Sequence, residues 1–150
     1  MKLFQKAKKS LGQNFLIDNN IINKIVEIGS VNKNKTIMEI GAGYGNLTRA
    51  IVCAGPKKIL AVEKDKKLVF FLKKKFRDCK NLKIINRDIL NIIEENNLEN
   101  NIVVFGNLPY NISTKVLASL IMLKKWPPWY DILILMFQKE VADRIIAKTQ

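Results

Sequence analysis

The sequence contains no histidine and only two cysteines, Cys53 and Cys79, which lie far apart and form no Cys-x-x-Cys pair. Zinc sites are built mainly from these two residue types, and many acid–base sites depend on histidine. The composition therefore excludes a recognisable zinc site and any histidine-dependent catalytic set, and no metal is expected. Two isolated cysteines predict buried or free thiols in a reducing compartment.

Long apolar runs are absent as well. The run at 132–137 is far too short to cross a bilayer, which takes about 20 residues. The N-terminus carries lysines but no continuous apolar segment after them, so it does not resemble a secretory signal. These features predict a cytoplasmic protein that makes no use of a membrane.

Acidic residues are few relative to basic ones. The 150-residue chain has 26 Lys and Arg against 13 Asp and Glu, a formal net charge of +13, which favours a polyanionic partner such as nucleic acid. Only four of the basic residues are arginine, and Lys, Ile and Asn are abundant together, as in proteins from AT-rich genomes. The charge is therefore weak evidence by itself. A hydrophobic content of 48% allows one domain with a substantial core.

Short apolar runs alternate with stretches of helical periodicity. The pattern predicts strands at 37–40, 59–62, 82–85, 102–105 and 132–137, and helices at 47–54, 68–76, 113–123 and from about 138. Ser113 or Thr114 is the expected N-cap of the third helix. Such alternation predicts an α/β fold with a mostly parallel, doubly wound sheet, whose ligand lies at the carboxyl ends of the strands.

The segment Gly41-Ala42-Gly43-Tyr44-Gly45 connects the first predicted strand to a helix, and its glycines allow a ligand to approach the backbone. It is not a nicotinamide fingerprint, because Asn46 stands where the third glycine would be. Glu63 ends the second strand, where a carboxylate can accept hydrogen bonds from both ribose hydroxyls. The alternative is a surface acid paired with Lys64 or Lys66.

Asp88 follows the third strand and is placed to accept a hydrogen bond from an adenine amino group. It can equally cap the helix that follows, and the two roles are compatible. No Lys or Arg occupies the glycine loop, so the predicted site is shaped for adenosine but has no cradle for phosphates. S-adenosylmethionine fits this description, and a dinucleotide does not.

Asn107-Leu108-Pro109-Tyr110 follows the fourth strand and suits methylation of the exocyclic amine of adenine. This nitrogen is a poor nucleophile because its lone pair is delocalised into the ring. The Asn107 side-chain oxygen and the Leu108 carbonyl can accept its two N–H hydrogens. Pro109 stiffens the loop, and Tyr110 offers a face on which an extruded base can stack. The alternative is an ordinary exit from a strand into a turn.

Four segments, 11–16, 39–43, 107–113 and 138–141, resemble in order and spacing the ribosomal RNA adenine dimethyltransferases, particularly the bacterial small-subunit members. The resemblance implies a Rossmann-like class I S-adenosylmethionine-dependent methyltransferase. It also implies N6,N6-dimethylation of two adjacent adenosines near the 3′ end of small-subunit (16S) ribosomal RNA during ribosome biogenesis. The residues that it assigns to the cofactor are Asn14, Leu16, Gly41, Gly43, Glu63, Asp88 and Asn107.

The resemblance also divides the chain. Residues 1–35 would form a basic arm and a helix that caps the cofactor, and residues 36–150 a methyltransferase domain that lacks its last strands and the helical C-terminal domain. The fifth strand would then keep an unpaired edge. The expected partner is ribosomal RNA within the small subunit, bound by a monomer.

Three alternatives remain open at this stage. Large-subunit erythromycin-resistance methylases usually have Ile at the position of Leu108 and lack the 138–141 segment. A non-catalytic RNA-binding assembly factor would also bind the subunit. DNA adenine methyltransferases usually begin the catalytic motif with Asp. Among the basic residues, the run at 73–75 is expected to be a solvated helix face, whereas Lys139 and Arg144 are better candidates for RNA contacts.

Overall fold

A computed structural model describes residues 16–147 except residue 96. Its centre is a five-stranded sheet with the order β3-β2-β1-β4-β5, in which every neighbouring pair is parallel. The strands are β1 (Thr36–Ile40), β2 (Lys58–Glu63), β3 (Leu82–Asn86), β4 (Ile102–Gly106) and β5 (Tyr130–Leu135). The predicted parallel, doubly wound sheet is confirmed.

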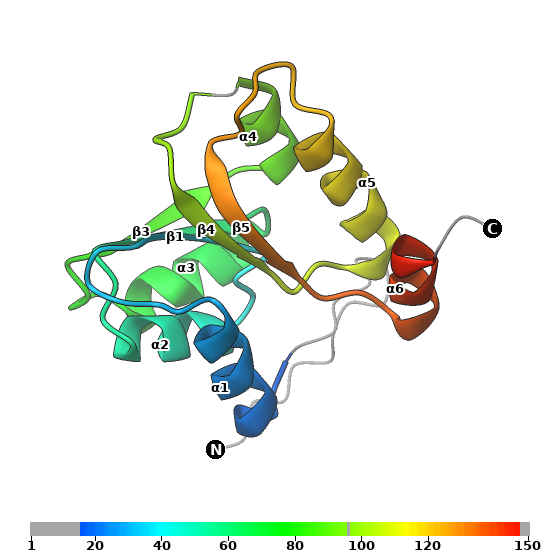
Figure 1. The fold of residues 1–150 in the computed structure, drawn as a ribbon. Helices are drawn as coiled ribbons and strands as arrows, with labels where there is room; N and C mark the ends of the chain where they lie inside the picture. Colours follow the sequence, from blue (N-terminus) through cyan, green and yellow to red (C-terminus); the bar gives the residue numbers. More distant parts are fainter. Residues whose placement is uncertain (1–15, 96, 148–150) are drawn as a thin grey trace.

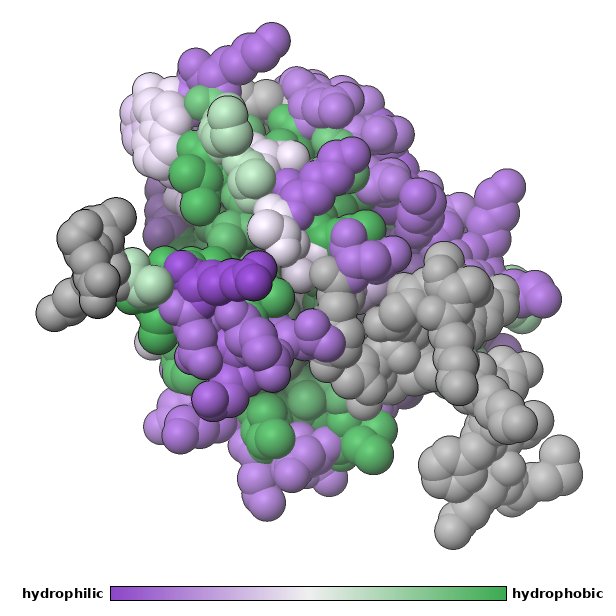
Figure 2. Space-filling view, turned by 90° about the vertical axis from the view of Figure 1, so that its right-hand side faces the viewer, coloured by the Kyte–Doolittle hydropathy of each residue, from purple (hydrophilic) through white to green (hydrophobic). Residues whose placement is uncertain are grey.

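Helices cover both faces of the sheet (Figure 1): α1, α2 and α3 lie on one face, α4 and α5 lie on the other, and α6 follows β5. The helices are α1 (Asn19–Ile28), α2 (Asn46–Cys53), α3 (Lys66–Lys75), α4 (Ile89–Glu95), α5 (Tyr110–Ile121) and α6 (Lys139–Ile146). Figure 2 shows the side of the molecule that bears α5 and α6, where hydrophilic and hydrophobic groups are interspersed.

Each face of the sheet has its own core because neighbouring residues of a strand point in opposite directions. On β1, Ile37 packs in a cluster with residues of α1 and α2, whereas Met38 and Ile40 pack in a cluster with residues of α4 and α5. All residues of β1 and β4 are buried. This explains why the central strands read as continuous apolar runs in the sequence.

The order of the strands places a crevice beside β1. The chain proceeds from β1 to β2 and β3 on one side and then returns to place β4 and β5 on the other. In such a sheet the connections on the two sides diverge at the carboxyl ends of the two central strands, which is where ligands bind. Here those strands are β1 and β4, which end at Ile40 and Gly106.

The predicted boundaries differ most from the observed ones at two elements. β5, expected at 132–137, spans Tyr130–Leu135. The helix expected to begin with Ser113 or Thr114 as its cap already begins at Tyr110, and Pro109 occupies the cap position. The carbonyl of Pro109 accepts hydrogen bonds from the N–H groups of Ile112 (3.0 Å) and Ser113 (3.1 Å). Pro109 lies just before the helix with φ −54° and ψ 136°, and no side-chain hydrogen bond caps the first turn.

β5 pairs with β4 and forms one end of the described sheet, as expected. Cys53 and Cys79 are free thiols, and Cys53 is exposed. In the segment between α5 and β5, Trp129 is buried against the core while Trp126 is exposed. Among the described helices, none is both long enough and apolar enough to span a bilayer.

Candidate active site

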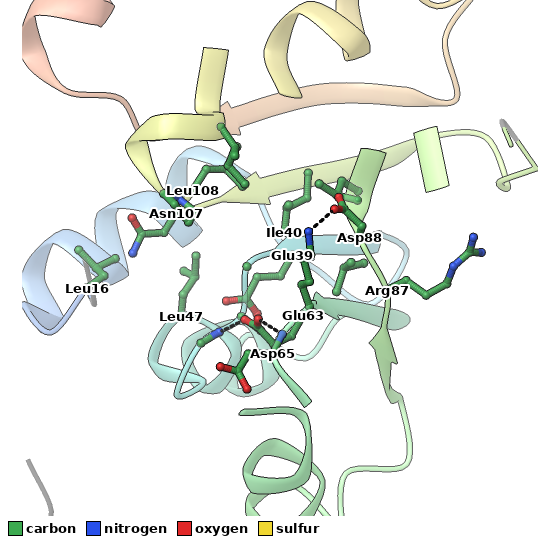
Figure 3. A pocket seen from close by; sticks show the side chains of 18 of the residues that line it. Leu16, Glu39, Ile40, Leu47, Glu63, Asp65, Arg87, Asp88, Asn107 and Leu108 are labelled. Atoms are coloured by element: carbon green, nitrogen blue, oxygen red, sulfur yellow. Dashed lines mark hydrogen bonds and ion pairs between the residues drawn. The ribbon is translucent and has the colours of Figure 1, made fainter. Parts of the chain in front are cut away.

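A cavity of about 440 Å³ opens at the carboxyl ends of the strands, within the range typical of small-molecule sites. Figure 3 shows its layout: Asn107 and Leu108 lie toward one end, Asp88 and Arg87 toward the other, and Glu63 between them. The predicted site residues that line it are Leu16, Gly41, Gly43, Glu63, Asp88, Asn107, Leu108 and Pro109. The cavity thus brings together segments from four connections of the fold.

Two of the predicted site residues cannot be placed in the wall of the cavity. Asn14 lies outside the described residues, and Tyr110 is placed only as the first residue of α5. The predicted roles of the Asn14 and Tyr110 side chains therefore stay predictions.

The glycine loop, which connects β1 to α2, forms one wall of the cavity. Gly41 has φ +76°, a conformation that residues with a Cβ rarely adopt, and its N–H donates to the Val62 carbonyl at 2.8 Å. A Cβ at Gly41 would lie 3.4 Å from the Asn107 carbonyl oxygen. The loop therefore passes close to the residue on which the predicted chemistry depends.

Glu63 is almost fully buried, with 8% of its surface exposed. Its Oε2 accepts a hydrogen bond from the Gly43 N–H at 2.9 Å, and its Oε1 accepts one from the Asp65 N–H at 2.9 Å. The alternative of a surface acid paired with Lys64 or Lys66 is wrong. The carboxylate instead ties the glycine loop to the end of β2, and each oxygen keeps a second lone pair that a ligand can use.

Asp88 lies at the far end of the cavity and has two partners. Its Oδ1 accepts from the Leu90 N–H at 3.1 Å at the start of α4, and its Oδ2 forms an ion pair with Lys64 at 2.7 Å. The hydrogen bond from Lys64 holds the pKa of Asp88 below its usual range, opposed by partial burial. The predicted cap is confirmed, and Asp88 stays charged as an acceptor-only group at the edge of the cavity.

Glu39 lines the cavity and was not predicted as a site residue. It is 2% exposed, and its Oε2 accepts a hydrogen bond from the Thr48 hydroxyl at 2.6 Å. Burial raises the pKa of Glu39 from 4.5 to about 8, partly offset by the Thr48 hydroxyl, and the nearby Glu63 charge raises it further. A charged residue inside the apolar run 37–40 was the signal that could have revealed it.

Asn46 was also missed. Its side-chain N–H donates to the Leu16 carbonyl at 2.9 Å and so fastens the segment before α1 to the beginning of α2. This is the position at which the loop departs from a nicotinamide fingerprint. The departure provides a donor that holds Leu16 at the wall of the cavity.

The chemistry of the lining fits a cationic adenosine cofactor. Four carboxyl side chains line the cavity against two basic ones. Both basic residues are engaged in ion pairs, Lys64 with Asp88 and Arg87 with Glu95. A diphosphate would need free cationic donors, whereas the three carboxyl groups other than Glu39, whose pKa is raised by burial, favour a sulfonium cation. In the part of the chain that the structure describes, no cluster of His, Cys, Asp or Glu could hold a metal ion.

Comparison with known proteins places the chain in a family. The family model described as ribosomal RNA adenine dimethylase matches residues 4–150. The chain belongs to this family. Among curated members, the ribosomal RNA small subunit methyltransferase A of Pelagibacter ubique is 53% identical over 97% of this chain, and that of Wolbachia pipientis is 43% identical over 98%.

The chain spans about half the length of these family members, 55% of the Pelagibacter protein and 51% of the Wolbachia protein. Solved structures of the same shape include a dimethyladenosine transferase from Plasmodium falciparum, with a TM-score of 0.74 and 28% identity over 90% of this chain and 47% of that one. The 23S rRNA methyltransferase ErmE has a TM-score of 0.73 at 24% identity, over 87% of this chain and 50% of that one. The likeness to ErmE concerns the fold alone.

Proposed function

We propose that this chain carries the catalytic part of an rRNA adenine N6,N6-dimethyltransferase that uses S-adenosylmethionine and acts on the small ribosomal subunit. One observation carries the proposal. The cavity at the β1–β4 crevice joins two carboxylate acceptors, Glu63 and Asp88, to the Asn107-Leu108 turn. Membership of the adenine dimethylase family and similarity to small-subunit methyltransferases support the choice of reaction and substrate.

Each part of the cofactor has residues suited to it. Glu63 would accept the ribose hydroxyls, Asp88 the adenine amino group, and the loop at Gly41 and Gly43 would take the methionine part. Leu16 lines the same cavity and would cover the cofactor from the N-terminal side. We assign Asn14 to the same role on the resemblance alone, with residues 1–35 as arm and cap and 36–150 as the methyltransferase domain.

The chemistry requires little from acid–base groups. When bound, S-adenosylmethionine supplies a methyl group on a positively charged sulfur, from which a neutral thioether leaves. Asn107 and the Leu108 carbonyl would hold the adenine amine in line with that methyl group and accept its N–H hydrogens. Leu108 is 3% exposed, so this acceptor is fixed by the core beneath it. Tyr110 would stack on the extruded base.

Substrate choice rests on the relatives. The two cited curated relatives are named as small subunit methyltransferases, and Leu108 differs from the Ile usual in large-subunit methylases. Lys139 and Arg144, on α6 after β5, would contact RNA phosphates. We place the reaction in the cytoplasm, with the protein acting as a monomer on ribosomal RNA.

The test compares Asn107→Ala with the wild type. We expect the variant to lose methyl transfer by about 100-fold or more, by analogy with the removal of one fixed polar group from a transition-state site. Its thermal unfolding should change little. Its cofactor affinity should fall far less than its rate of methyl transfer, because Asn107, although also assigned to the cofactor, acts mainly on the amine. Asn91→Ala, an exposed asparagine on α4, is the matched control and should keep full activity.

Three results would contradict this assignment. Near-normal turnover by Asn107→Ala would refute the proposed role of Asn107 in the mechanism. Preferential methylation of large-subunit RNA would favour the alternative substrate, and subunit binding without transfer by the wild type would favour an assembly factor. Titrating both subunits in parallel with the same enzyme preparation separates these outcomes.

A further inference from the structure

The glycine loop is supported from outside the cavity by the C-terminal end of α3. A Cβ at Gly45 would lie 2.6 Å from Phe76 Cε2 and 2.8 Å from Leu72 Cδ2, so the loop backbone lies directly against these side chains. Gly45 has φ +75° and precedes α2 as its N-cap. The shape of the loop therefore depends on what α3 presents to it.

Lys75 provides the polar part of this support. Its ammonium group donates to the Tyr44 carbonyl at 2.6 Å and lies 3.5 Å from the Gly45 carbonyl. The same group lies over the rings of Phe71, at 5.7 Å, and Phe76, at 5.3 Å. The two rings help to hold the ammonium group in place, because aromatic faces attract cations. Lys75 is exposed, as predicted for the whole run 73–75, but its ammonium group is bound to the loop and is not merely solvated.

Lys75 also interacts electrostatically with Glu39, which lines the cavity. Partial burial lowers its pKa, helped by Arg49, while Glu39 acts in the opposite direction. Glu39 in turn has its pKa lowered by Lys75 among smaller effects. The side chain thus interacts with the loop backbone and, through space, with a carboxyl group that lines the cavity.

We propose that Lys75 is a positioning residue that fixes the glycine loop in its cofactor-binding shape from the side opposite the cavity. The inference rests on the proposed function, in which this loop takes the methionine part of S-adenosylmethionine. The loop has a second anchor, the bond from the Gly43 N–H to Glu63 at 2.9 Å. When the ribose hydroxyls bind Glu63, this carboxylate serves both the ligand and the loop. Lys75 lies outside the cavity and serves the loop alone.

The first test measures cofactor binding by calorimetry with S-adenosylmethionine. Lys75→Met keeps the length and the apolar stem but removes the donor, and we expect its Kd to rise about tenfold, as for loss of a hydrogen bond to a charged group. Lys75→Arg retains a charged donor and should stay within about threefold of the wild type. Lys74→Met, its exposed neighbour on α3, is the matched control and should bind as the wild type does.

A second measurement needs no cofactor. Hydrogen exchange of the amides at 43–46 in the free protein should be at least several-fold faster in Lys75→Met and unchanged in Lys74→Met. If Lys75→Met does not fold, Lys75→Gln, whose side chain is too short to reach the Tyr44 carbonyl, takes its place in both experiments.

The outcomes are distinct. A Kd for Lys75→Met within twofold of the wild type, or unchanged exchange at 43–46, overturns the role of Lys75. A wild-type protein that does not bind S-adenosylmethionine refutes the proposed function instead, and the exchange experiment still decides whether Lys75 fixes the loop. A rise in Kd equal in Lys75→Met and Lys74→Met points to a general effect of charge and also overturns the role of Lys75.

Discussion

Individual carboxyl groups around the cavity differ in protonation because their surroundings differ. Asp88 is partly exposed and bound to Lys64, so its pKa is lowered and it stays ionised. Glu39 lies on the central strand beneath the glycine loop, and burial raises its pKa to about 8. At neutral pH Glu39 is therefore mainly a neutral acid, which reduces the negative charge of the cavity lining.

Glu39 makes stability depend on pH in a definite direction. A carboxyl group whose pKa is higher in the folded than in the unfolded protein binds a proton more tightly when folded. Its contribution is fully present below the unfolded pKa and is lost as the pH rises from 4.5 to about 8. Over that window the free energy of unfolding should fall by up to about 1.4 kcal/mol per pH unit from this group.

Glu39→Gln should abolish that slope, because glutamine does not titrate and its carbonyl can still accept from the Thr48 hydroxyl. Urea unfolding at pH 5, 6, 7 and 8 measures the effect, with Glu94→Gln on the exposed part of α4 as the control. The stability difference between Glu39→Gln and the wild type should move in favour of the variant as the pH rises. A difference that is constant with pH would show that Glu39 is charged in the folded protein.

Among the secondary-structure elements, strands were predicted more accurately than helix starts. β1, β2 and β4 are almost entirely buried and β3 is a partly buried apolar run, and the predicted limits of all four fall within one residue of the observed ones. The start of α5 was missed because Asn107, Pro109 and Tyr110 are residues typical of turns. In the structure the turn leads directly into the helix, so the predicted catalytic motif is also the helix start.

Sequence patterns carry the least information about side-chain contacts between elements. The run 73–75 contains three identical residues, and nothing local distinguishes the one that reaches the loop 31 residues earlier. Lys75 lies one turn after Phe71 on α3, and its ammonium group lies over the rings of Phe71 and Phe76 beside the loop. Contacts of this kind depend on tertiary packing, which the hydrophobic periodicity of the sequence does not determine.

The packing of α1 on the sheet leaves no room at its C-terminal end. Gly29 is buried, and a Cβ there would lie 2.3 Å from Phe105 Cζ on β4. Gly29→Ala should lower the free energy of unfolding by about 1–3 kcal/mol, the usual cost of overpacking. Because the clash is with one ring, the penalty should shrink when Phe105→Leu is also present, as a double-mutant cycle by urea unfolding can measure. Additive effects would mean that the ring is not the obstacle.

For the molecule as a whole, the net charge and the length of the chain both bear on the proposed activity. The net charge of +13 suits a polyanionic partner, although part of it reflects composition. The chain spans about half the length of its curated relatives, and its described sheet ends at β5. The described residues include the cavity at the β1–β4 crevice together with the turn at Asn107, so both cofactor binding and methyl transfer can be measured on this chain.

The most direct test is methyl transfer from labelled S-adenosylmethionine to unmethylated small ribosomal subunits, followed by digestion of the RNA and identification of nucleosides by mass spectrometry. We predict N6,N6-dimethyladenosine in two adjacent positions near the 3′ end of the small-subunit RNA, and none when Asn107→Ala replaces the wild type. Methyl groups on other atoms, or no methylated adenosine although calorimetry shows the cofactor bound, would contradict the proposed activity of this chain.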